Sequence, residues 1–430
     1  MNRSSRRRTR RRAPRKAVAV AAAIVCTASL AACSGDDGGT PELTWYINPD
    51  AGGQDAVAEA CSTDAYTIAT EVLPQDSSQQ RIQLARRLAA GDPAIDLMSL
   101  DPPFTAEFAN AGYLAEIPQD MQDAFREQAF ESAAAAATWN DQLVVAPFWS
   151  NTQVLWYRKS FVEKAGLDMG QPVTWDQIIQ AASDNGGTVA VQANKYEGYT
   201  VWINALIAGA GGDIASETEK GADASIDIAS QAGQDAAQVI TELTGSEAAP
   251  ADLSVSNEGT AAATFAGDTG AFMVNWTYIL NGAGYPEEIV DDLGWTRYPE
   301  TVEGEESRPP YGGIGIGVSE FSDEKDFSVQ ALECLTSPEN QAVNAELTGN
   351  MPASEAGYDQ PKVKELFPAD LIALFQESLE TAAPRTLSPY WSDMSGSIQN
   401  TWHPPSGVTD QTPQESAQFI EDVLQGRSLL

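Results

Sequence analysis

Residues 95–112, IDLMSLDPPFTAEFANAG, contain a predicted strand, a turn and a helix in direct succession. Ile95–Leu100 is an apolar run bounded by turn residues, which is typical of a buried strand. Asp101-Pro102-Pro103 ends that strand, and Phe104–Ala111 has helical spacing with Gly112 as its C-cap. A strand followed at once by a helix is the repeating unit of an α/β fold.

The same alternation continues on both sides of this unit. Upstream, two predicted strands flank a helix, and a second helix begins after a cap at Ser77 or Ser78. The further predicted strands and extended segments are Leu43–Ile47, Tyr66–Leu73, Leu143–Pro147, Gln153–Tyr157, Ala271–Asn275 and Gly313–Val318. The further predicted helices are Asp55–Cys61, one that opens with a capping box at Thr174–Gln177, Gly233–Leu243, one that starts at Ser337-Pro338, and Glu365–Leu379. This order predicts a mainly parallel sheet with helices on both faces. A chain of 430 residues exceeds what one core usually supports, so we expect two lobes.

The N-terminal segment resembles a bacterial lipoprotein leader. Nine Arg or Lys residues and no acid precede an apolar stretch, Ala17–Ala32, which has the length of a signal-peptide core. The stretch runs into Leu30-Ala31-Ala32-Cys33, which resembles a site where signal peptidase II cleaves before a Cys that then carries acyl chains. We therefore expect a signal peptide over 1–32, lipidation at Cys33 and a flexible tether over 33–41. An uncleaved N-terminal anchor is the alternative.

The remaining cysteines suggest a covalent constraint. Cys26 lies in the leader and is lost with it, which leaves Cys61 and Cys334 beyond Cys33. Because exported chains meet an oxidising environment, we expect a Cys61–Cys334 disulfide, worth roughly 5 kcal/mol by loop closure. Two separate buried thiols are the alternative. The chain has no CxxC motif and no Cys/His cluster, so the sequence predicts no metal site.

The chain is strongly acidic outside its leader. Nine of its 25 basic residues and none of its 61 acidic residues lie in the leader, so the remainder keeps 16 basic residues and a net charge near −45. Such a surface repels phosphate backbones and anionic lipid headgroups, which excludes nucleic acid as a partner. A neutral ligand is favoured over an anionic one.

Two polar residues lie where an α/β sheet binds ligands. In open parallel sheets, ligands collect beyond the carboxyl ends of the strands. Asp101 directly follows such a strand, although it could instead cap the helix Phe104–Ala111. Asn151 lies between two extended segments, at a candidate hinge crossing, and offers both a donor and an acceptor, as a hydroxyl group requires. A turn asparagine is the alternative for Asn151.

An aromatic residue and a glycine-rich strand are the next candidates. Trp276 follows the predicted strand Ala271–Asn275, and an indole face packs well against the C–H face of a sugar ring. Because the chain has ten Trp residues, a core position is the alternative. Gly313, Gly315 and Gly317 share one face of their predicted strand, which leaves that face open to close approach by backbone or ligand.

The sequence gives little support for catalysis or for a bound cofactor. His403 is the sole histidine, no GxSxG motif is present, and the glycines at 312–317 match neither a dinucleotide loop nor a phosphate loop. Carboxylates and aromatics together leave a glycosidase as an alternative of another class, and a glycan-binding surface adhesin as a third. We expect a binding protein without a cofactor, not an enzyme.

Longer motifs are spread from the leader almost to the C-terminus. They are LARRL at 84–88, residues 96–112, SNTQVLWY at 150–157, VQAN at 191–194, EGTAAATF at 258–265, VNW at 274–276 and AAPRTLSPY at 382–390. Together they resemble the family 1 extracellular solute-binding proteins of carbohydrate ABC importers. Within that family they are most similar to the trehalose-binding lipoproteins of mycobacteria.

The resemblance implies a set of ligand-binding residues. The sugar contacts of those lipoproteins fall on Asp101, Asn151, Glu258, Trp276, Gly313 and Arg385. Carboxylates accept from hydroxyls, arginine donates, the glycine offers its backbone and the indole stacks. Glu258 and Arg385 are expected to pair, which would limit the cost of burying either charge. Further candidates, whose aromatic members would accept a longer or differently linked sugar, are Gln80, Tyr311, Tyr390 and Trp391.

The implied fold is a two-lobed α/β fold like that of periplasmic binding proteins of the maltose-binding type, with the ligand cleft between the lobes. We expect one lobe over 42–150 and 297–340, and the other over 151–296 and 341–430. The implied function is that of a monomeric, lipid-anchored substrate-binding protein on the extracytoplasmic face of the cell membrane. It would close around trehalose or a similar α-linked disaccharide and deliver it to the permease subunits of an ABC importer. Maltose-type or longer oligosaccharides are the alternative ligands.

Overall fold

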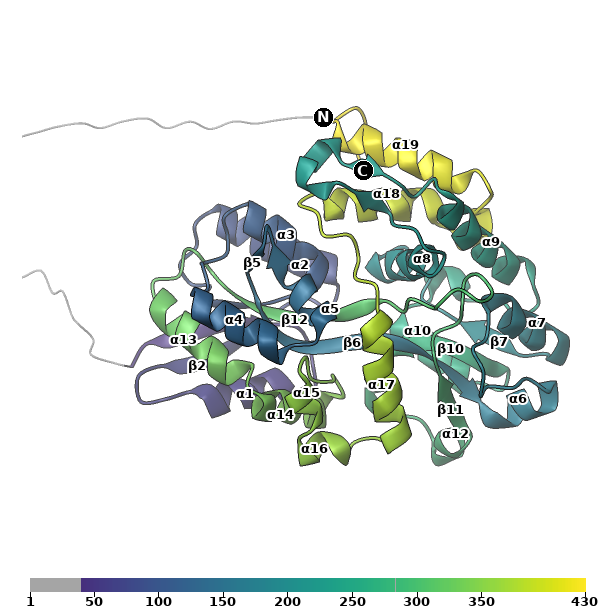
Figure 1. Ribbon diagram of the computed structural model, residues 1–430, viewed down its shortest axis with the longest axis horizontal. Helices are drawn as coiled ribbons and strands as arrows, with labels where there is room; N and C mark the ends of the chain where they lie inside the picture. Colours follow the sequence, from purple (N-terminus) through teal and green to yellow (C-terminus); the bar gives the residue numbers. More distant parts are fainter. Residues whose placement is uncertain (1–39, 283) are drawn as a thin grey trace, which may run out of the picture. The chain divides into compact units, whose positions relative to one another are not determined.

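One mixed sheet organises the part of the chain that the structure describes (Figure 1). The computed structural model describes residues 40–282 and 284–430, so the expected leader and Cys33 lie outside the described residues. Residues 40–430 form one compact unit. The strand order in the sheet is β2-β1-β3-β12-β6-β10-β7, and β11 pairs with β6 along the edge opposite to β10.

The elements alternate along the chain as the sequence predicts. The strands of the sheet are β1 Glu42–Ile47, β2 Thr67–Val72, β3 Leu97–Leu100, β6 Ala146–Arg158, β7 Thr188–Ala190, β10 Gly270–Trp276, β11 Leu293–Thr296 and β12 Tyr311–Val318. Two short hairpins add β4 Thr138–Trp139 with β5 Gln142–Leu143, and β8 Ala215–Ser216 with β9 Ser225–Ile226. The helices of the first half are α1 Gly53–Cys61, α2 Ser77–Ala89, α3 Pro102–Asn110, α4 Gln119–Gln128, α5 Glu131–Ala136, α6 Lys159–Ala165, α7 Trp175–Asn185 and α8 Glu197–Gly209. Those of the second half are α9 Gln231–Gly245, α10 Glu258–Ala266, α11 Ile279–Gly282, α12 Glu287–Asp291, α13 Lys325–Leu335, α14 Pro338–Thr348, α15 Glu355–Tyr358, α16 Pro361–Lys364, α17 Ala369–Thr381, α18 Trp391–Trp402 and α19 Thr412–Leu424.

Strand β6 joins two lobes. Its residues 146–152 pair with β12, which continues to β3, β1 and β2, and we call this side the first lobe. Its residues 153–158 pair with β10 and β11, and β10 continues to β7 in the second lobe. The two extended segments expected at 143–147 and 153–157 are therefore largely one strand. No turn interrupts it, because residues 150–152 keep pairing with β12.

The sheet is mixed, so the prediction of a mainly parallel sheet was wrong: parallel pairing is confined to the outer strands of each lobe. β1 pairs in parallel with β2 and β3, and β10 pairs in parallel with β7. β12 runs antiparallel to β3 and β6, and β10 antiparallel to β6. The carboxyl ends of β1 and β3 thus lie at the same edge of the first lobe, and the segments that follow them lie close together.

Local capping explains where several helices start. α7 begins with the predicted capping box, in which the Thr174 hydroxyl accepts from the Gln177 N–H and the Gln177 side chain accepts from the Thr174 N–H. Ser337 caps α14 as expected. α2 differs from the prediction, because the Asp76 side chain rather than that of Ser77 or Ser78 accepts from the Gln79 N–H.

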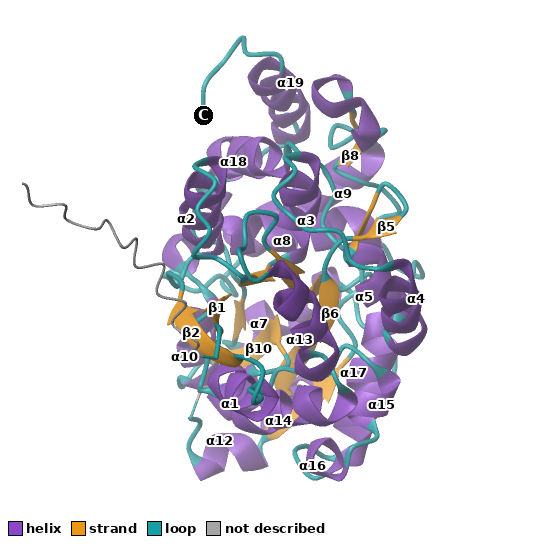
Figure 2. Cartoon of the chain, turned by 90° about the vertical axis from the view of Figure 1, so that its left-hand side faces the viewer, coloured by secondary structure: helices purple, strands orange, loops and turns teal. Residues whose placement is uncertain are grey.

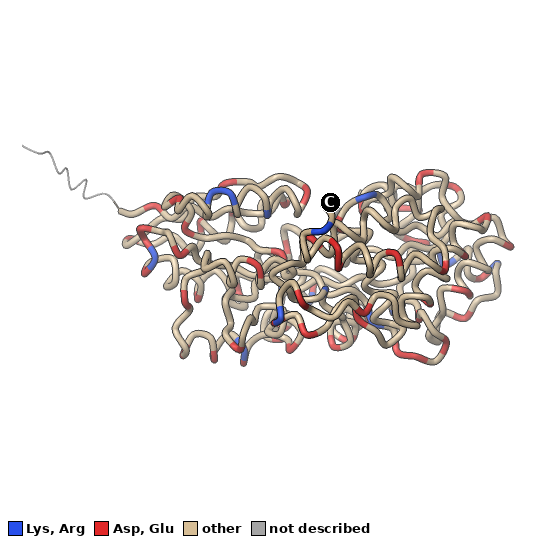
Figure 3. Tube along the Cα trace, turned by 90° about the horizontal axis from the view of Figure 1, so that it is seen from above, with Lys and Arg blue, Asp and Glu red and all other residues tan. Residues whose placement is uncertain are grey.

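Helices enclose the strands on both sides, as the view turned by 90° shows (Figure 2). α1, α2, α3, α13 and α14 lie around the first lobe, and α7, α8, α9, α10, α18 and α19 around the second (Figure 1). Large aromatic side chains fill both interiors, among them Trp45 in the first lobe and Trp175, Trp202 and Trp402 in the second. Acidic residues are spread along the described chain and basic ones are few (Figure 3).

A disulfide joins Cys61, at the end of α1, to Cys334 in α13, which is the pairing expected from the sequence. The bond itself lies in the first lobe, but the stretch of chain that it closes runs through both lobes, since the two cysteines are 273 residues apart. The residue bounds expected for the lobes stay a prediction. The bound at 340/341 falls inside α14, which packs on α1, so we propose that the first lobe includes the whole of this helix. Across residues 40–282 and 284–430, no helix is both long and apolar enough to cross a membrane.

Candidate ligand-binding site

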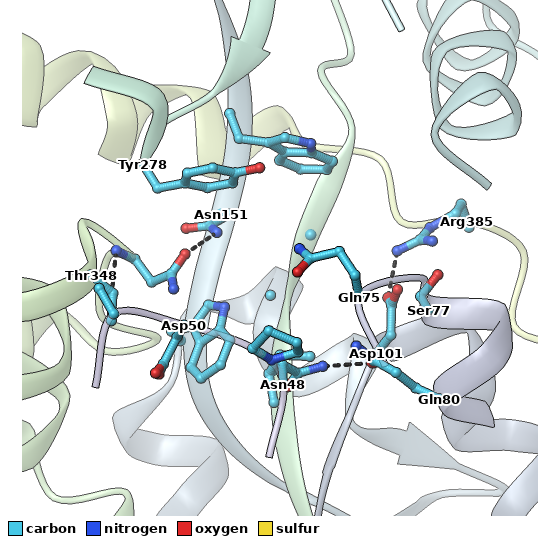
Figure 4. Close-up of a pocket in the computed structure, with 18 residues that line it drawn as sticks. Asn48, Asp50, Gln75, Ser77, Gln80, Asp101, Asn151, Tyr278, Thr348 and Arg385 are labelled. Carbon is cyan, nitrogen blue, oxygen red and sulfur yellow. Dashed lines mark hydrogen bonds and ion pairs between the residues drawn. The ribbon is translucent and has the colours of Figure 1, made fainter. Parts of the chain in front are cut away.

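A cavity of about 410 Å³ lies where the two lobes meet at β6, and both lobes form its wall (Figure 4). The first lobe supplies the segments that follow β1 and β3 and the start of α2. The second lobe supplies the end of β10 and Arg385, which precedes α18. The lining residues are Asn48, Pro49, Asp50, Ala51, Gln75, Ser77, Gln80, Asp101, Trp149, Asn151, Trp276, Tyr278, Gly312, Gly313, Ile314, Thr348, Asn350 and Arg385.

Asp101 lines the cavity instead of capping a helix. Its backbone occupies the N-cap position of α3, but its side chain makes no capping hydrogen bond. The carboxylate accepts from the Arg385 guanidinium, with 2.6 Å between Oδ1 and Nη2. Burial raises the pKa of Asp101, and the charge of Arg385 opposes that shift only in part. The cavity therefore contains a carboxylate that still has acceptor capacity for a ligand.

Arg385 is held by two carboxylates rather than by the one that was expected. Its Nη2 donates to Asp101, and its Nη1 donates to Glu197 Oε1 at 3.0 Å. The predicted pair with Glu258 does not form. The Arg385 side chain is only 5 % exposed, so a guanidinium at this depth needs charged partners. Burial alone would lower the pKa of Arg385, but the two carboxylates outweigh it and the pKa is raised.

Asn151 reaches the cavity from the middle of β6, where the strand passes between the lobes. Its Nδ2 donates to Asn350 Oδ1 at 2.8 Å. Its Oδ1 already accepts from the Thr277 hydroxyl at 3.2 Å and from the Met351 N–H at 3.4 Å. The expectation that Asn151 offers both a donor and an acceptor is thus only half right, because its second N–H is the group left for a ligand.

Trp276 is a cavity residue and not a core residue. It ends β10, is partly exposed, and lines the cavity beside Tyr278. Gly312 permits this position, since a Cβ there would lie 2.6 Å from Cζ3 of the indole. Gly313 lines the cavity with a φ of +135° and lies against the backbone of Trp149, where a Cβ would lie 2.3 Å from the carbonyl oxygen. Both glycines are therefore needed for the shape of the wall.

Glu258 lies behind the cavity wall. It is the first residue of α10, whose N-cap is Asn257, and it is not among the lining residues. Burial raises the pKa of Glu258; its own backbone N–H and the side chains of Tyr196 and Trp276 oppose the shift, and no Lys or Arg contributes. A buried carboxylate next to the Trp276 indole can orient that ring or accept from a ligand that reaches past it.

Of the four further ligand-binding candidates, Gln80 lies at the cavity, and Tyr311, Tyr390 and Trp391 do not line it. Gln80 lines the cavity, accepts from Asn48 Nδ2 at 2.8 Å and donates to the Pro74 carbonyl at 2.7 Å. Tyr311 is buried, and its hydroxyl bonds Ser150 Oγ at 3.0 Å. Neither it nor Tyr390 lines the cavity, so neither is an aromatic contact there.

Trp391 is also withdrawn from the cavity, which corrects the expectation of a rim contact. It is fully buried in α18, and its Nε1 donates to Glu197 Oε1 at 2.9 Å. Trp391 thus supports the carboxylate that holds Arg385, and it is not among the residues that line the cavity.

Several lining residues were missed from the sequence. Asn48 and Asp50 directly follow β1, so the strand-end rule that selected Asp101 would have found them. Asn48 Oδ1 is buried without a hydrogen-bond partner among the described residues. Trp149 lies two positions before the predicted Asn151, and Tyr278 lies two positions after the predicted Trp276. Glu197 has no local signal, because its role depends on a contact with Arg385, 188 residues away.

The arrangement suits binding better than metal chemistry. The first-lobe wall contains mainly amide, hydroxyl and carboxylate groups together with the Trp149 ring, and the second lobe adds Trp276 and Tyr278. Figure 4 shows Tyr278 on the side of the cavity opposite Asn48 and Asp50. Within the described residues, no group of three or more His, Cys, Asp or Glu side chains could hold a metal ion.

Comparisons with known proteins agree with this architecture. The model of the bacterial extracellular solute-binding protein family matches residues 54–342. A probable ABC transporter-binding protein of Deinococcus radiodurans is 24 % identical over 342 residues, which cover 75 % of this chain and 78 % of the relative.

Solved structures share the fold across most of the chain. Maltose-bound MalE3 of T. maritima is 23 % identical with a TM-score of 0.77, over 90 % of this chain and 100 % of that one. The GacH receptor of Streptomyces glaucescens, solved unliganded and with acarbose, is 19 % identical with a TM-score of 0.73, over 90 % and 98 %. The cyclic alpha-maltosyl-1,6-maltose binding protein of Arthrobacter globiformis is 19 % identical with a TM-score of 0.71, over 90 % and 100 %. The chain therefore has the two-lobed fold of maltose-binding-type proteins.

Proposed function

The chain belongs to the family of bacterial extracellular solute-binding proteins, and on that premise we propose that it binds a small uncharged sugar between its two lobes. One observation carries the proposal: polar groups of the first lobe line the same cavity as aromatic rings of both lobes, Trp149 from the first and Trp276 and Tyr278 from the second. A sugar presents hydroxyl groups at its edge and C–H groups on its faces, so it matches both walls at once.

The partner that we propose is the membrane permease of an ABC importer. The name of the Deinococcus relative supports it, as does a cavity whose wall comes from both lobes. A ligand that contacts both lobes stabilises the closed arrangement, whereas a ligand that contacts one lobe shifts no equilibrium. Closure around the sugar would then be the signal that the permease recognises.

The sugar that we propose is trehalose or a similar α-linked disaccharide, with maltose-type sugars as the competing ligands. The distributed motifs support trehalose, and the ligands named for the similar structures support α-glucosides more broadly. The acidic character of the described chain disfavours phosphorylated or otherwise anionic sugars (Figure 3). We further propose that Cys33, outside the described residues, anchors the mature chain to the membrane through acyl chains.

Calorimetric titration of residues 40–430 with trehalose and then maltose tests the proposal, with the sugar recovered and checked for cleavage afterwards. We expect one-to-one binding and intact sugar. Slow release of glucose, abolished by a substitution of Asp101 or Glu258, would instead identify a glycosidase. Absence of binding for every neutral sugar tried would contradict the proposed ligand class.

A further inference from the structure

Arg385 lines two cavities. It lines the candidate site together with Asp101, and it also lines a second cavity of about 550 Å³ on the other side of its segment. The second cavity is formed mainly by residues 211–219 and 383–387, and Arg385 is the residue common to both linings. Figure 4 places Arg385, Asp101 and Ser77 at one end of the candidate site, with Thr348 toward the opposite end.

The guanidinium at this end is fixed from both lobes. Asp101 of the first lobe holds Nη2 at 2.6 Å, and Glu197 of the second lobe holds Nη1 at 3.0 Å. Charge-assisted bonds at this burial are strong, and breaking either of them leaves a buried charge without its partner. Arg385 therefore cannot swing aside at low cost.

Glu197 is itself held by groups outside both cavities. Besides Arg385, its carboxylate accepts from Trp391 Nε1 at 2.9 Å and from the Ser395 hydroxyl at 2.5 Å. It is the first residue of α8, and its side chain is 6 % exposed. Glu197 lines neither cavity, so any effect on a ligand must pass through Arg385.

We propose that Glu197 is a positioning residue that locks Arg385 as the end wall of the sugar cavity, and that this lock limits the ligand to a disaccharide. The inference rests on the proposed function. A third sugar ring added at this end of the site would need the space of the guanidinium and of the second cavity behind it. Moving the guanidinium out of that space would break its hydrogen bonds to Asp101 and Glu197. Glu197→Gln keeps the shape of the side chain but removes its charge, which weakens its hold on the Arg385 guanidinium.

The test is a titration of residues 40–430 with maltose, maltotriose and maltotetraose, for the wild type and for Glu197→Gln. We expect the wild type to bind maltotriose at least about ten-fold more weakly than maltose, because the longer sugar must displace a fixed charge. In Glu197→Gln we expect this difference to narrow to about three-fold or less. The double variant Glu197→Gln with Arg385→Gln removes the guanidinium and its partner charge together, and should remove the length preference.

Asp96→Asn is the matched control, because Asp96 is also a buried carboxylate, accepting from the Thr44 N–H and the Ser322 hydroxyl, but it does not line the cavity. It should keep the wild-type length preference. Equal affinity of the wild type for maltose and maltotriose, or an equal loss for all lengths in Glu197→Gln, would overturn the proposal. If the wild type bound neither these three saccharides nor trehalose, the proposed function itself would fail, and the inference with it.

Discussion

The two walls of the cavity are built in different ways. The first-lobe wall takes many of its polar groups from residues that directly follow strands or start a helix, such as Asn48 and Asp50 after β1 and Asp101 after β3. The second-lobe wall depends on contacts between distant segments. There, Arg385 is fixed by Glu197 of α8, and Trp276 fits only because β12 has a glycine at 312.

The two walls also differ in whether their buried carboxylates have a counter-charge. Asp101 has a cation directly opposite, so its charge is compensated across the lobes. Glu258 lies behind Trp276 with no Lys or Arg contributing to its pKa. The first wall therefore provides polar groups at sites that local structure already defines. The second wall holds an aromatic surface and an uncompensated carboxylate at some cost to stability.

Asp101→Asn should have the largest effect on binding, because it breaks the ion pair that joins the two walls. Loss of one partner in a buried, hydrogen-bonded charge pair costs about 2–5 kcal/mol, so we expect sugar affinity to fall by about 100-fold or more. Calorimetric titration measures this effect. Asp92→Asn is the control, since Asp92 forms a similar pair with Arg87 at 2.7 Å away from the cavity. Wild-type affinity in Asp101→Asn would mean that the first wall does not bind the ligand.

Trp276→Ala should come next, because it removes the aromatic surface of the second wall. We expect affinity to fall by about 1–3 kcal/mol, the usual range for losing a buried apolar contact. The same titration measures it. Trp295→Ala is the matched control, since Trp295 is also partly exposed but bonds Asp370 outside the cavity. If both variants bound equally well, Trp276 would have no role in the ligand site.

Gly312→Ala tests the position of the Trp276 ring in the second wall, because it adds a methyl group beside the ring and removes no polar group. The new Cβ would lie 2.6 Å from the Trp276 ring and force the indole to move. Overpacking of this kind costs about 1–3 kcal/mol in all. We expect about 1–1.4 kcal/mol of it to act on binding, which lowers sugar affinity by about five- to ten-fold. Gly245→Ala, where a Cβ meets no atom within 4 Å, should bind as the wild type does. Unchanged binding in Gly312→Ala would show that the indole position is not limiting.

Glu258→Gln should have the smallest effect of the four substitutions. The quantity that it changes is the thermal stability of the fold rather than sugar affinity. Burial raises the pKa of Glu258 above its unfolded value of about 4.3, so the folded chain binds more protons in the window between the two pKa values. Stability therefore rises as the pH falls into that window, and the ionised carboxylate destabilises the fold at neutral pH. We expect Glu258→Gln to raise the Tm at pH 7 by about 1–2 °C and to flatten its pH dependence above pH 5.

Thermal unfolding between pH 5 and pH 8 measures that effect. Glu59→Gln, at an exposed position of α1, is the control and should follow the wild type. A lower Tm for Glu258→Gln at pH 7 would mean that the ionised carboxylate stabilises the fold, contrary to the comparison above.

The fold and the first wall could largely be predicted from the sequence. Strand and helix signals around residues 95–112 place Asp101 at a strand end, and the same rule, applied after β1, leads to Asn48. Local patterns decide these positions, because they depend on a few neighbouring residues. The exact helix start was less certain, as Asp76 rather than Ser77 caps α2.

The second wall could not be predicted in this way. Arg385 and Asp101 are 284 residues apart, and no local pattern reveals that they meet. Arg385 and Glu258 were selected by resemblance alone, and their expected pair was wrong, since Arg385 is paired with Glu197. Trp276 and Trp391 look alike in sequence, yet one lines the cavity and the other is buried. Only the packing of elements that are distant in the sequence decides whether such a tryptophan lines the cavity or is buried.

The central claim is that one sugar binds between the two walls and contacts both. A crystal structure of residues 40–430 grown with trehalose, and with maltose as a second ligand, tests it most directly. We predict density for a single disaccharide in the 410 Å³ cavity, with hydroxyl groups at Asp101 and a ring face against Trp276. Density at another site, or a sugar that contacts one lobe only, would contradict the account.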